Sequence, residues 1–172
     1  MGVIIGGIDQ KTKNALKVQH VLKSIERHAS KPGSKDLSAR VTQPELNDYI
    51  VYRLAQEKQF LIHKIEVHLL ENNNVQGKLR LDAQQLNLGM LFGEVMDIDF
   101  KGTLHTRDGA ARLDLAALEL NSQPIKPQML NLVFSAVSTY YGTEFGRIED
   151  WRKLPKGINR IIVHKGWADL LY

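Results

Sequence analysis

Six histidines are the residues of this chain that could bind a metal ion through nitrogen. They are His20, His28, His63, His68, His105 and His164. Zinc sites on helices use pairs such as His-x-x-x-His, and no pair here has that spacing. His63 and His68 are nearest in sequence, but they fall on opposite faces of an expected strand. Cysteine is absent. The sequence therefore predicts no metal site, no disulfide and no cofactor.

Two aspartates and three serines are the other groups with catalytic potential. Asp97 and Asp99 share one face of an expected strand, as paired carboxylates for acid–base chemistry could. Lys101 continues the same polar face, which favours a solvated surface. The serines stand in no Gly-x-Ser-x-Gly turn, and they are Ser122, Ser135 and Ser138. We predict no catalytic residue and expect that the protein is not an enzyme, unless polar side chains meet across the fold.

Composition describes a globular protein with a mixed surface. The chain has 172 residues, 43% of them hydrophobic, and 23 Lys+Arg against 19 Asp+Glu give a net charge of only +4. A nucleic-acid-binding surface would need a concentrated basic stripe, so no nucleic-acid partner is expected. Basic residues do gather at 11–31 and 152–165, where they could contact an anionic membrane surface.

Three helices are predicted by apolar residues at helical spacing, over 14–29, 43–57 and 127–141, and the third is apolar over much of its circumference, as in a helix covered on most sides. Thr42 and Glu45 form a capping box at the start of the second helix, with Pro44 in its first turn. Proline, glycine and serine at 30–36 predict a loop. We therefore divide the chain into an N-terminal segment, 1–37, and a single domain, 38–172.

Strands are predicted wherever apolar and polar residues alternate with period two. The sequence gives two hairpins within a meander, 60–82 and 96–120, and a C-terminal hairpin, 158–172. A change of phase before Leu118 predicts a β-bulge that bends its strand. The segment 83–94 fits either a short helix or a strand edge. The expected fold is α+β: a long curved antiparallel sheet, made of the meander and the C-terminal hairpin, wrapped around a long helix, with an additional N-terminal helix.

The lengths of these elements suggest an apolar groove. The long strands would extend roughly 33 Å, whereas the helix 127–141 would extend about 22 Å. The uncovered apolar face could then bind a ligand, although any sheet core requires the same alternation. Gly77 and Gly102 lie on this face and either leave space for a ligand or permit a bend or close packing. The predicted groove residues are Ile65, Val67, Leu79, Met96, Ile98, Phe100, Leu113, Leu115, Leu130, Phe134 and Val137.

Short motifs resemble a known family. Residues 41–50 read Val-Thr-Gln-Pro-Glu-Leu-Asn-Asp-Tyr-Ile, and related patterns occur at 73–79 and 154–158. They are similar to motifs of small bacterial tubular lipid-binding (TULIP-like) proteins, which resemble half of a bactericidal/permeability-increasing-protein domain. The resemblance covers about residues 38–172 and implies a sheet curved around a helix, a hydrophobic groove for a lipid, and no catalytic residue. The N-terminal helix is not part of the pattern.

The same resemblance implies a periplasmic or membrane-anchored envelope protein, while a cytoplasmic location stays open. No apolar run of about 18 residues exists. The apolar start, 1–8, lacks the basic region of a signal peptide, so one interpretation is that the chain begins just after or inside a targeting segment.

Aromatic and basic residues concentrate in the last third of the chain. Trp151, Arg152 and Trp167 could form a membrane-facing rim, or the two tryptophans could plug the end of the sheet. The expected partner is a lipid or another apolar small molecule, with peripheral membrane contact. Two alternatives remain, a protein–protein interaction module with a fully packed core and a small hydrolase or isomerase.

Overall fold

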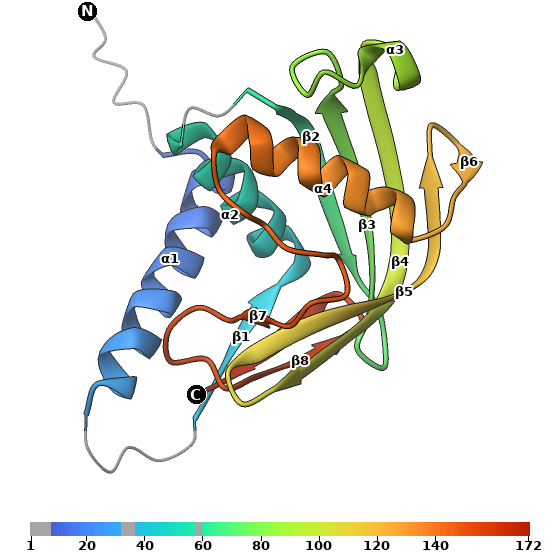
Figure 1. The fold of residues 1–172 in the computed structure, drawn as a ribbon. Coiled ribbons are helices and arrows are strands. Elements are labelled where there is room, and N and C mark those ends of the chain that lie inside the picture. The colour runs from blue at the N-terminus through green and yellow to red at the C-terminus, as the bar shows by residue number, and fades with distance from the viewer. Residues whose placement is uncertain (1–7, 32–36, 58–59) are drawn as a thin grey trace, which may run out of the picture.

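The computed structural model describes residues 8–31, 37–57 and 60–172 (Figure 1). Its helices are α1 (Gln10–Ala29), α2 (Gln43–Gln56), α3 (Gly89–Phe92) and α4 (Gln128–Tyr141). Helix α1 begins earlier than predicted because the Asp9 carboxylate accepts a hydrogen bond from the Thr12 N–H and caps it. The predicted capping box of α2 is confirmed, since Thr42 and Glu45 bond reciprocally. Residues 1–7, most of the apolar start, and most of the predicted loop lie outside the described residues.

The meander forms the larger of two antiparallel sheets. Its main strands are β2 (Ile62–Leu69), β3 (Asn74–Asp82), β4 (Val95–Arg107) and β5 (Ala110–Leu120), and two short strands flank β5, namely β6 (Gln123–Pro124) and β7 (Arg152–Lys153). The predicted α+β class is confirmed. The segment 83–94 folds as turns and the short helix α3.

The C-terminal hairpin belongs to the smaller sheet. Strands β8 (Arg160–His164) and β9 (Trp167–Leu171) form the hairpin, and β9 pairs with β1 (Ser38–Thr42), a strand that the sequence pattern did not indicate. We expected the hairpin to extend the meander. It instead pairs with β1 in a separate sheet. Strand β1 was missed because its hydrogen-bonding partner lies at the other end of the chain.

Both edges of the larger sheet are hydrogen-bonded to other segments. On the β2 edge, the Asn47 side chain accepts from the Val67 N–H and donates to the Val67 carbonyl, both at 2.8 Å. The Gln43 side chain accepts from the Leu69 N–H, also at 2.8 Å. At the other edge, β6 and β7 pair with the two ends of β5. Two side chains of α2 thus act as a partner strand and leave β2 little edge to offer the hairpin.

The edge of β8 that does not pair with β9 is hydrogen-bonded to the larger sheet. The Val163 N–H donates to the Asn73 side chain at 2.7 Å, and the Ile161 N–H donates to the Thr106 hydroxyl at 3.1 Å. Asn73 and Thr106 lie at the ends of the two meander hairpins, so the smaller sheet closes one end of the larger one. An apolar cluster containing Leu69, Val75, Val163 and Ala168 fills the junction.

A bulge bends the longest hairpin, as predicted. Lys101 pairs with Ala117, whereas Gly102 pairs with Leu115, so Ala116 is the extra residue. A bulge increases the local twist and bends the strand. In Figure 1, β4 and β5 curve below α4 toward the smaller sheet.

Helix α1 packs into the fold. Val18 and Ile25 share an apolar cluster with Val41, Ile158 and Leu170, which belong to or adjoin the smaller sheet. Lys17 of α1 forms an ion pair with the buried Glu45 carboxylate of α2. These contacts attach the predicted N-terminal segment to the 38–172 domain.

Substitution of Asn47 tests the side-chain partner of β2. In Asn47→Ala, the Val67 N–H and carbonyl lose their hydrogen bonds in a partly buried place, so we expect the free energy of unfolding to fall by about 1–3 kcal/mol. Urea denaturation measures the change. Gln56→Ala, on an exposed position of the same helix, is the control and should be close to neutral. Equal effects of the two substitutions would contradict the role of Asn47.

Acid should weaken the α1–α2 contact through Glu45. Burial raises the pKa of this carboxyl, but hydrogen bonds from Lys17 and Thr42 outweigh it, so the pKa lies below its ordinary value of 4.5. A carboxyl with a pKa lowered by folding stabilises the protein above its unfolded pKa, and this stabilisation is lost as pH falls through the folded pKa.

We therefore expect Glu45→Gln to lower the free energy of unfolding by about 1 kcal/mol at neutral pH, because Lys17 is largely solvated and the ion pair is screened. The difference from wild type should shrink as pH falls below 4.5. Denaturation curves at a series of pH values measure it, with the exposed Glu94→Gln as control. A difference that grows on acidification would refute the assignment.

Candidate functional site

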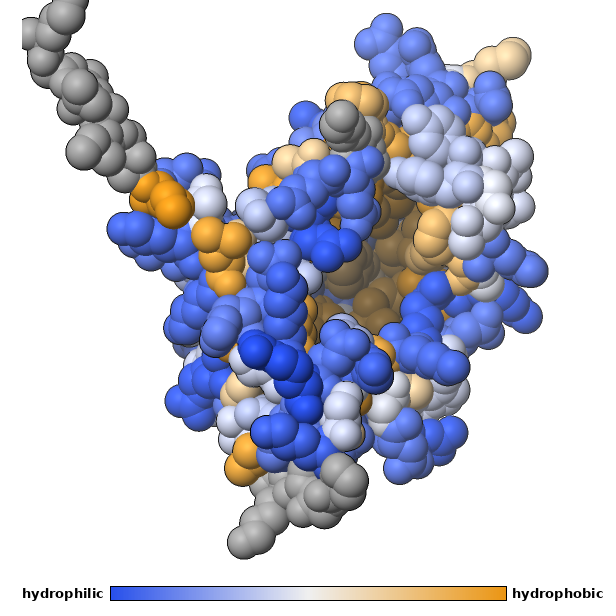
Figure 2. All heavy atoms as spheres, turned by 90° about the vertical axis from the view of Figure 1, so that its left-hand side faces the viewer, coloured by the Kyte–Doolittle hydropathy of each residue, from blue (hydrophilic) through white to orange (hydrophobic). Residues whose placement is uncertain are grey.

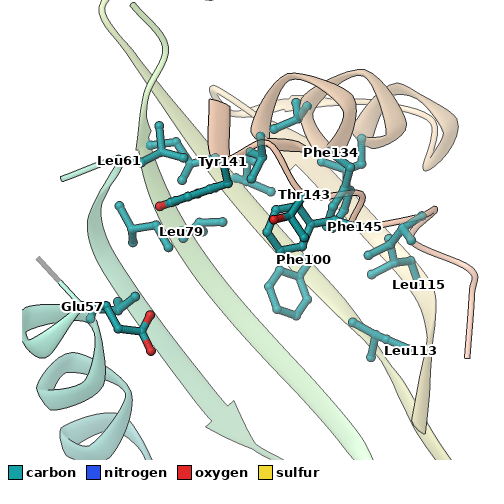
Figure 3. Close-up of a pocket in the computed structure, with 18 residues that line it drawn as sticks. Glu57, Leu61, Leu79, Phe100, Leu113, Leu115, Phe134, Tyr141, Thr143 and Phe145 are labelled. Carbon is teal, nitrogen blue, oxygen red and sulfur yellow. The ribbon is translucent and has the colours of Figure 1, made fainter. Parts of the chain in front are cut away.

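A cavity of about 660 Å³ lies between the larger sheet, α4 and the end of α2. This volume is within the range of about 300–1,000 Å³ found for small-molecule sites. Figure 3 shows side chains from the sheet and from α4 directed toward the space between them. The lining residues are Leu54, Glu57, Leu61, Ile62, Leu79, Leu81, Ile98, Phe100, Leu113, Leu115, Leu130, Val133, Phe134, Val137, Tyr141, Thr143, Phe145 and Ile148.

Helix α4 is shorter than the strands it lies across, and its residues from Leu130 to Tyr141 line the cavity between helix and sheet. Strand β4 has 13 residues and α4 has 14, which correspond to about 43 Å and 21 Å. Beneath α4, buried side chains such as Met96, Leu118 and Leu120 form a filled core. Beyond that core, the apolar face of the sheet borders the cavity.

The cavity opens to the surface. Figure 2 shows a deep recess with apolar walls and a mostly hydrophilic rim. Among the described residues of the lining, three carry a polar side-chain group: Glu57 just after α2, and Tyr141 and Thr143 at and just beyond the end of α4. The Glu57 carboxylate accepts a hydrogen bond from the Arg53 guanidinium at 2.7 Å. An apolar chain inside the cavity would meet hydrocarbon almost everywhere.

Tyr141 is the titratable phenol of the lining. Burial raises its pKa above the ordinary value of 10.0, and the neighbouring Tyr140 and the Glu57 carboxylate raise it further. The phenol is therefore neutral at physiological pH and can donate a hydrogen bond. Its ring packs edge-on against Tyr140 and Phe145, with centroids 5.0 and 6.0 Å away.

The segment after α4 is fixed against that helix and forms one wall of the cavity. The Ser138 hydroxyl accepts from the Phe145 N–H at 3.0 Å, and the Asn131 side chain accepts from the Ile148 N–H at 3.2 Å. The Arg152 guanidinium donates to the Phe145 carbonyl at 2.6 Å. These bonds hold the side chains of Phe145 and Ile148 in the lining.

Eight of the predicted groove residues line the cavity. They are Leu79, Ile98, Phe100, Leu113, Leu115, Leu130, Phe134 and Val137. Three others do not, although they share the inner face of the sheet. Met96 is fully buried in the core beneath α4, and Val67 packs in the junction cluster. Ile65 of β2 is half-buried and pairs with Leu79 of β3. Periodicity identified the face, but the covering helices decided which part of it is open.

The three predicted rim residues do not line the cavity. Trp151 packs beneath Arg107, whose guanidinium is 4.4 Å from the ring centroid. Arg152 hydrogen-bonds to the cavity wall and lies over the Phe134 ring. Trp167 belongs to the smaller sheet, between Arg40 and His164. The two tryptophans are therefore apart: Trp151, just before β7, packs against the larger sheet, and Trp167 lies on the smaller one.

Sequence reasoning missed ten lining residues for two reasons. Leu81 and Val133 continue apolar faces that were recognised and could have been included. The others come from the end of α2, the start of β2, the last residue of α4 and the segment after it, where no periodicity points to a cavity. These are Leu54, Glu57, Leu61, Ile62, Tyr141, Thr143, Phe145 and Ile148.

The two glycines of the inner face serve close packing. Gly77 pairs with Phe100 across β3 and β4, and a methyl group at Gly77 would overlap the Phe100 ring. The ring thus lies over the glycine and is part of the cavity lining. At Gly102, a methyl group would lie 2.5 Å from the Asp114 carbonyl oxygen, beside the bulge. Neither glycine contributes open space, so the close-packing alternative is the one observed.

Two further features bear on chemistry. Within 8–31, 37–57 and 60–172, no group of three or more His, Asp or Glu side chains is placed to hold a metal ion. Over the same ranges, none of the helices combines the length and the apolar character needed to cross a membrane.

Substitutions of the two glycines should behave differently. Gly77→Ala should lower the free energy of unfolding by about 1–3 kcal/mol, because it forces the Phe100 ring toward the cavity. In a Phe100→Leu background the same change should cost less, since the overlapping ring atoms are gone. Gly102→Ala should not be relieved in this way, because it meets backbone.

Urea denaturation of the single and double variants measures these couplings. Gly89→Ala is the control, since its nearest neighbour would be a flexible Gln84 side-chain atom at 3.3 Å. If Phe100→Leu leaves the cost of Gly77→Ala unchanged, the ring does not pack on the glycine.

Known proteins offer no further guide to this site. No family model, curated protein sequence or solved structure matches the chain. Function must therefore be inferred from the cavity: its volume, its hydrocarbon lining, and its opening beside three polar groups.

Proposed function

We propose that this protein binds a lipid or a similar amphiphile, with the hydrocarbon part in the cavity between the larger sheet and α4. The supporting observation is a surface-open cavity of about 660 Å³ whose lining is almost entirely aliphatic and aromatic. Burial of apolar ligand surface supplies about 25 cal/mol per Å² before the costs of binding, so hydrocarbon is the chemistry that this lining favours.

The polar groups of the lining suggest how the ligand is oriented. Glu57 is more than half exposed, and Tyr141 is also partly exposed, so both are within reach of solvent. A polar headgroup near them would keep water or a hydrogen-bond partner, whereas deeper in the cavity it would lose both. The proposed ligand therefore enters with its apolar end first. This binding role includes no catalytic step.

An envelope location and a role in lipid transfer belong to the same proposal. They derive from the TULIP-like resemblance of residues 41–50. Within that motif, Thr42 and Glu45 cap α2 and Asn47 bonds to β2, so its residues support the fold and do not contact the cavity. The proposal of periplasmic or membrane-anchored placement thus rests on the resemblance, and that of ligand binding rests on the cavity.

A protein–protein interaction module is the alternative from another functional class. It was expected to have a fully packed core, with an exposed strand edge or α1 as the binding surface. The cavity is the observation that favours a ligand over this alternative.

Native mass spectrometry and lipid extraction of the purified chain test the proposal. We expect a co-purifying lipid, or saturable uptake of a fatty acid added to delipidated protein. Val137→Phe should weaken fatty-acid binding by about 10–100-fold, because the added ring occupies the cavity and displaces about 1–3 kcal/mol of apolar contacts.

Val51→Phe is the matched control, since Val51 is 55% exposed on α2 and outside the cavity. It should bind as wild type does. Thermal denaturation of both variants checks that they fold. Absence of any lipid or fatty-acid binding by the folded wild type, or an equal loss in both variants, would refute the proposed function.

A further inference from the structure

Helix α1 presents a basic ridge to solvent. We define this ridge as Lys13, Leu16, His20, Lys23 and Arg27, which follow one another at alternating intervals of three and four residues. This spacing places all five side chains on one face of a helix. All five are exposed, whereas the opposite face buries Ala15, Val18 and Ile25. The ridge extends roughly 21 Å along the helix.

The cations of the ridge are not neutralised by neighbouring carboxylates. None of the ion pairs found in the described part of the chain involves Lys13, Lys23 or Arg27. The guanidinium of Arg27 donates to a backbone carbonyl, that of Lys23. Glu26, an acidic residue of α1, pairs instead with Lys156.

Cations on the outer face of the larger sheet contrast with the ridge. Arg80 forms a two-bond ion pair with Asp97, and Lys78 pairs with Asp99. Charge on that face is therefore balanced locally. The ridge instead carries three cations, Lys13, Lys23 and Arg27, that form no ion pair within the described residues.

Helix α1, which carries the ridge, and the cavity mouth lie on the same side of the molecule. Figure 2 views the molecule from the side on which α1 lies in Figure 1, and both the helix and the apolar recess are visible in that view. Apolar side chains are interspersed among the cations: Leu16 is 36% exposed, and Ile8, just before α1, is 57% exposed. Basic residues mixed with exposed apolar ones are typical of helices that lie on anionic bilayers.

We propose that the basic ridge of α1 docks the protein on an anionic lipid surface and thereby turns the cavity mouth toward the bilayer. The significance of this orientation rests on the proposed lipid-binding function. Charge supplies the attraction, since each Lys or Arg near an anionic membrane adds favourable energy. Leu16 supplies an apolar contact that a nucleic-acid phosphate backbone would not use. A membrane is therefore the occupant that the ridge fits better than a nucleic acid.

Vesicle co-sedimentation of the full chain tests the docking. The vesicles are phosphatidylcholine alone, or equimolar phosphatidylcholine and phosphatidylglycerol. We expect binding to the anionic vesicles only, weakened by added salt. The ridge variant Lys13→Gln, Lys23→Gln, Arg27→Gln keeps good helix formers and should lose at least about tenfold in affinity. Leu16→Ser should also weaken binding.

The matched control removes three exposed cations outside both basic clusters: Lys64→Gln on β2, Lys101→Gln on β4, and Lys126→Gln before α4. It has the same net charge as the ridge variant and should bind the vesicles nearly as wild type does. Equal loss in both variants would mean that only net charge matters and would overturn the proposal. So would unchanged binding by the ridge variant, or wild-type binding to duplex DNA in place of anionic vesicles.

Two readouts separate this proposal from the proposed function. In vesicle-free solution, the ridge variant should take up fatty acid as wild type does, and Val137→Phe should sediment with anionic vesicles although its cavity is filled. If wild type takes up no fatty acid but the ridge still binds vesicles, the cavity proposal fails and docking stands. If fatty acid is taken up and vesicles are not bound, only the docking proposal fails.

Discussion

Hydrogen bonding along the edges of the larger sheet determines the arrangement of the other elements. A strand edge that is left unpaired will accept another strand, and here the Gln43 and Asn47 side chains of α2 fill much of the β2 edge while β6 and β7 pair with β5. The C-terminal hairpin therefore pairs with β1, and its other edge bonds to the ends of the meander. The sequence predicted a single wrapping sheet. The structure has two sheets, and the β8 edge of the smaller one contacts the hairpin ends of the larger one.

This arrangement leaves the inner face of the larger sheet to α4 and the segment that follows it. A helix of about 21 Å cannot cover strands twice as long, and the bulge at Ala116 curves those strands without closing them. Interior space between well-packed side chains is normally small, because voids forfeit dispersion contacts. A cavity of about 660 Å³ with hydrocarbon walls is therefore the feature of this fold best suited to bind a ligand.

The two glycines of the inner face illustrate how packing and cavity are related. On sequence grounds, each could have been a site of open space. The Phe100 ring instead lies over Gly77, and the Asp114 backbone approaches Gly102. The glycines allow the sheet to hold a large aromatic side chain and a bend at its centre. The open volume lies between the sheet and α4, and Phe100 itself is part of its lining.

Local patterns in the sequence determined the elements themselves. Alternation and capping residues predicted three helices, the meander, the bulge and the inner face that contains eight of the cavity residues, because these features depend on neighbours within a few positions. The ridge of α1 also follows from spacing alone. Contacts distant in sequence decided the rest: the pairing of β1 with β9, the bonding of Asn47 to β2, and the inclusion of Leu54, Glu57 and Phe145 in the cavity lining. Periodicity states which face is apolar, but only the tertiary structure decides whether that face is covered by protein or left open.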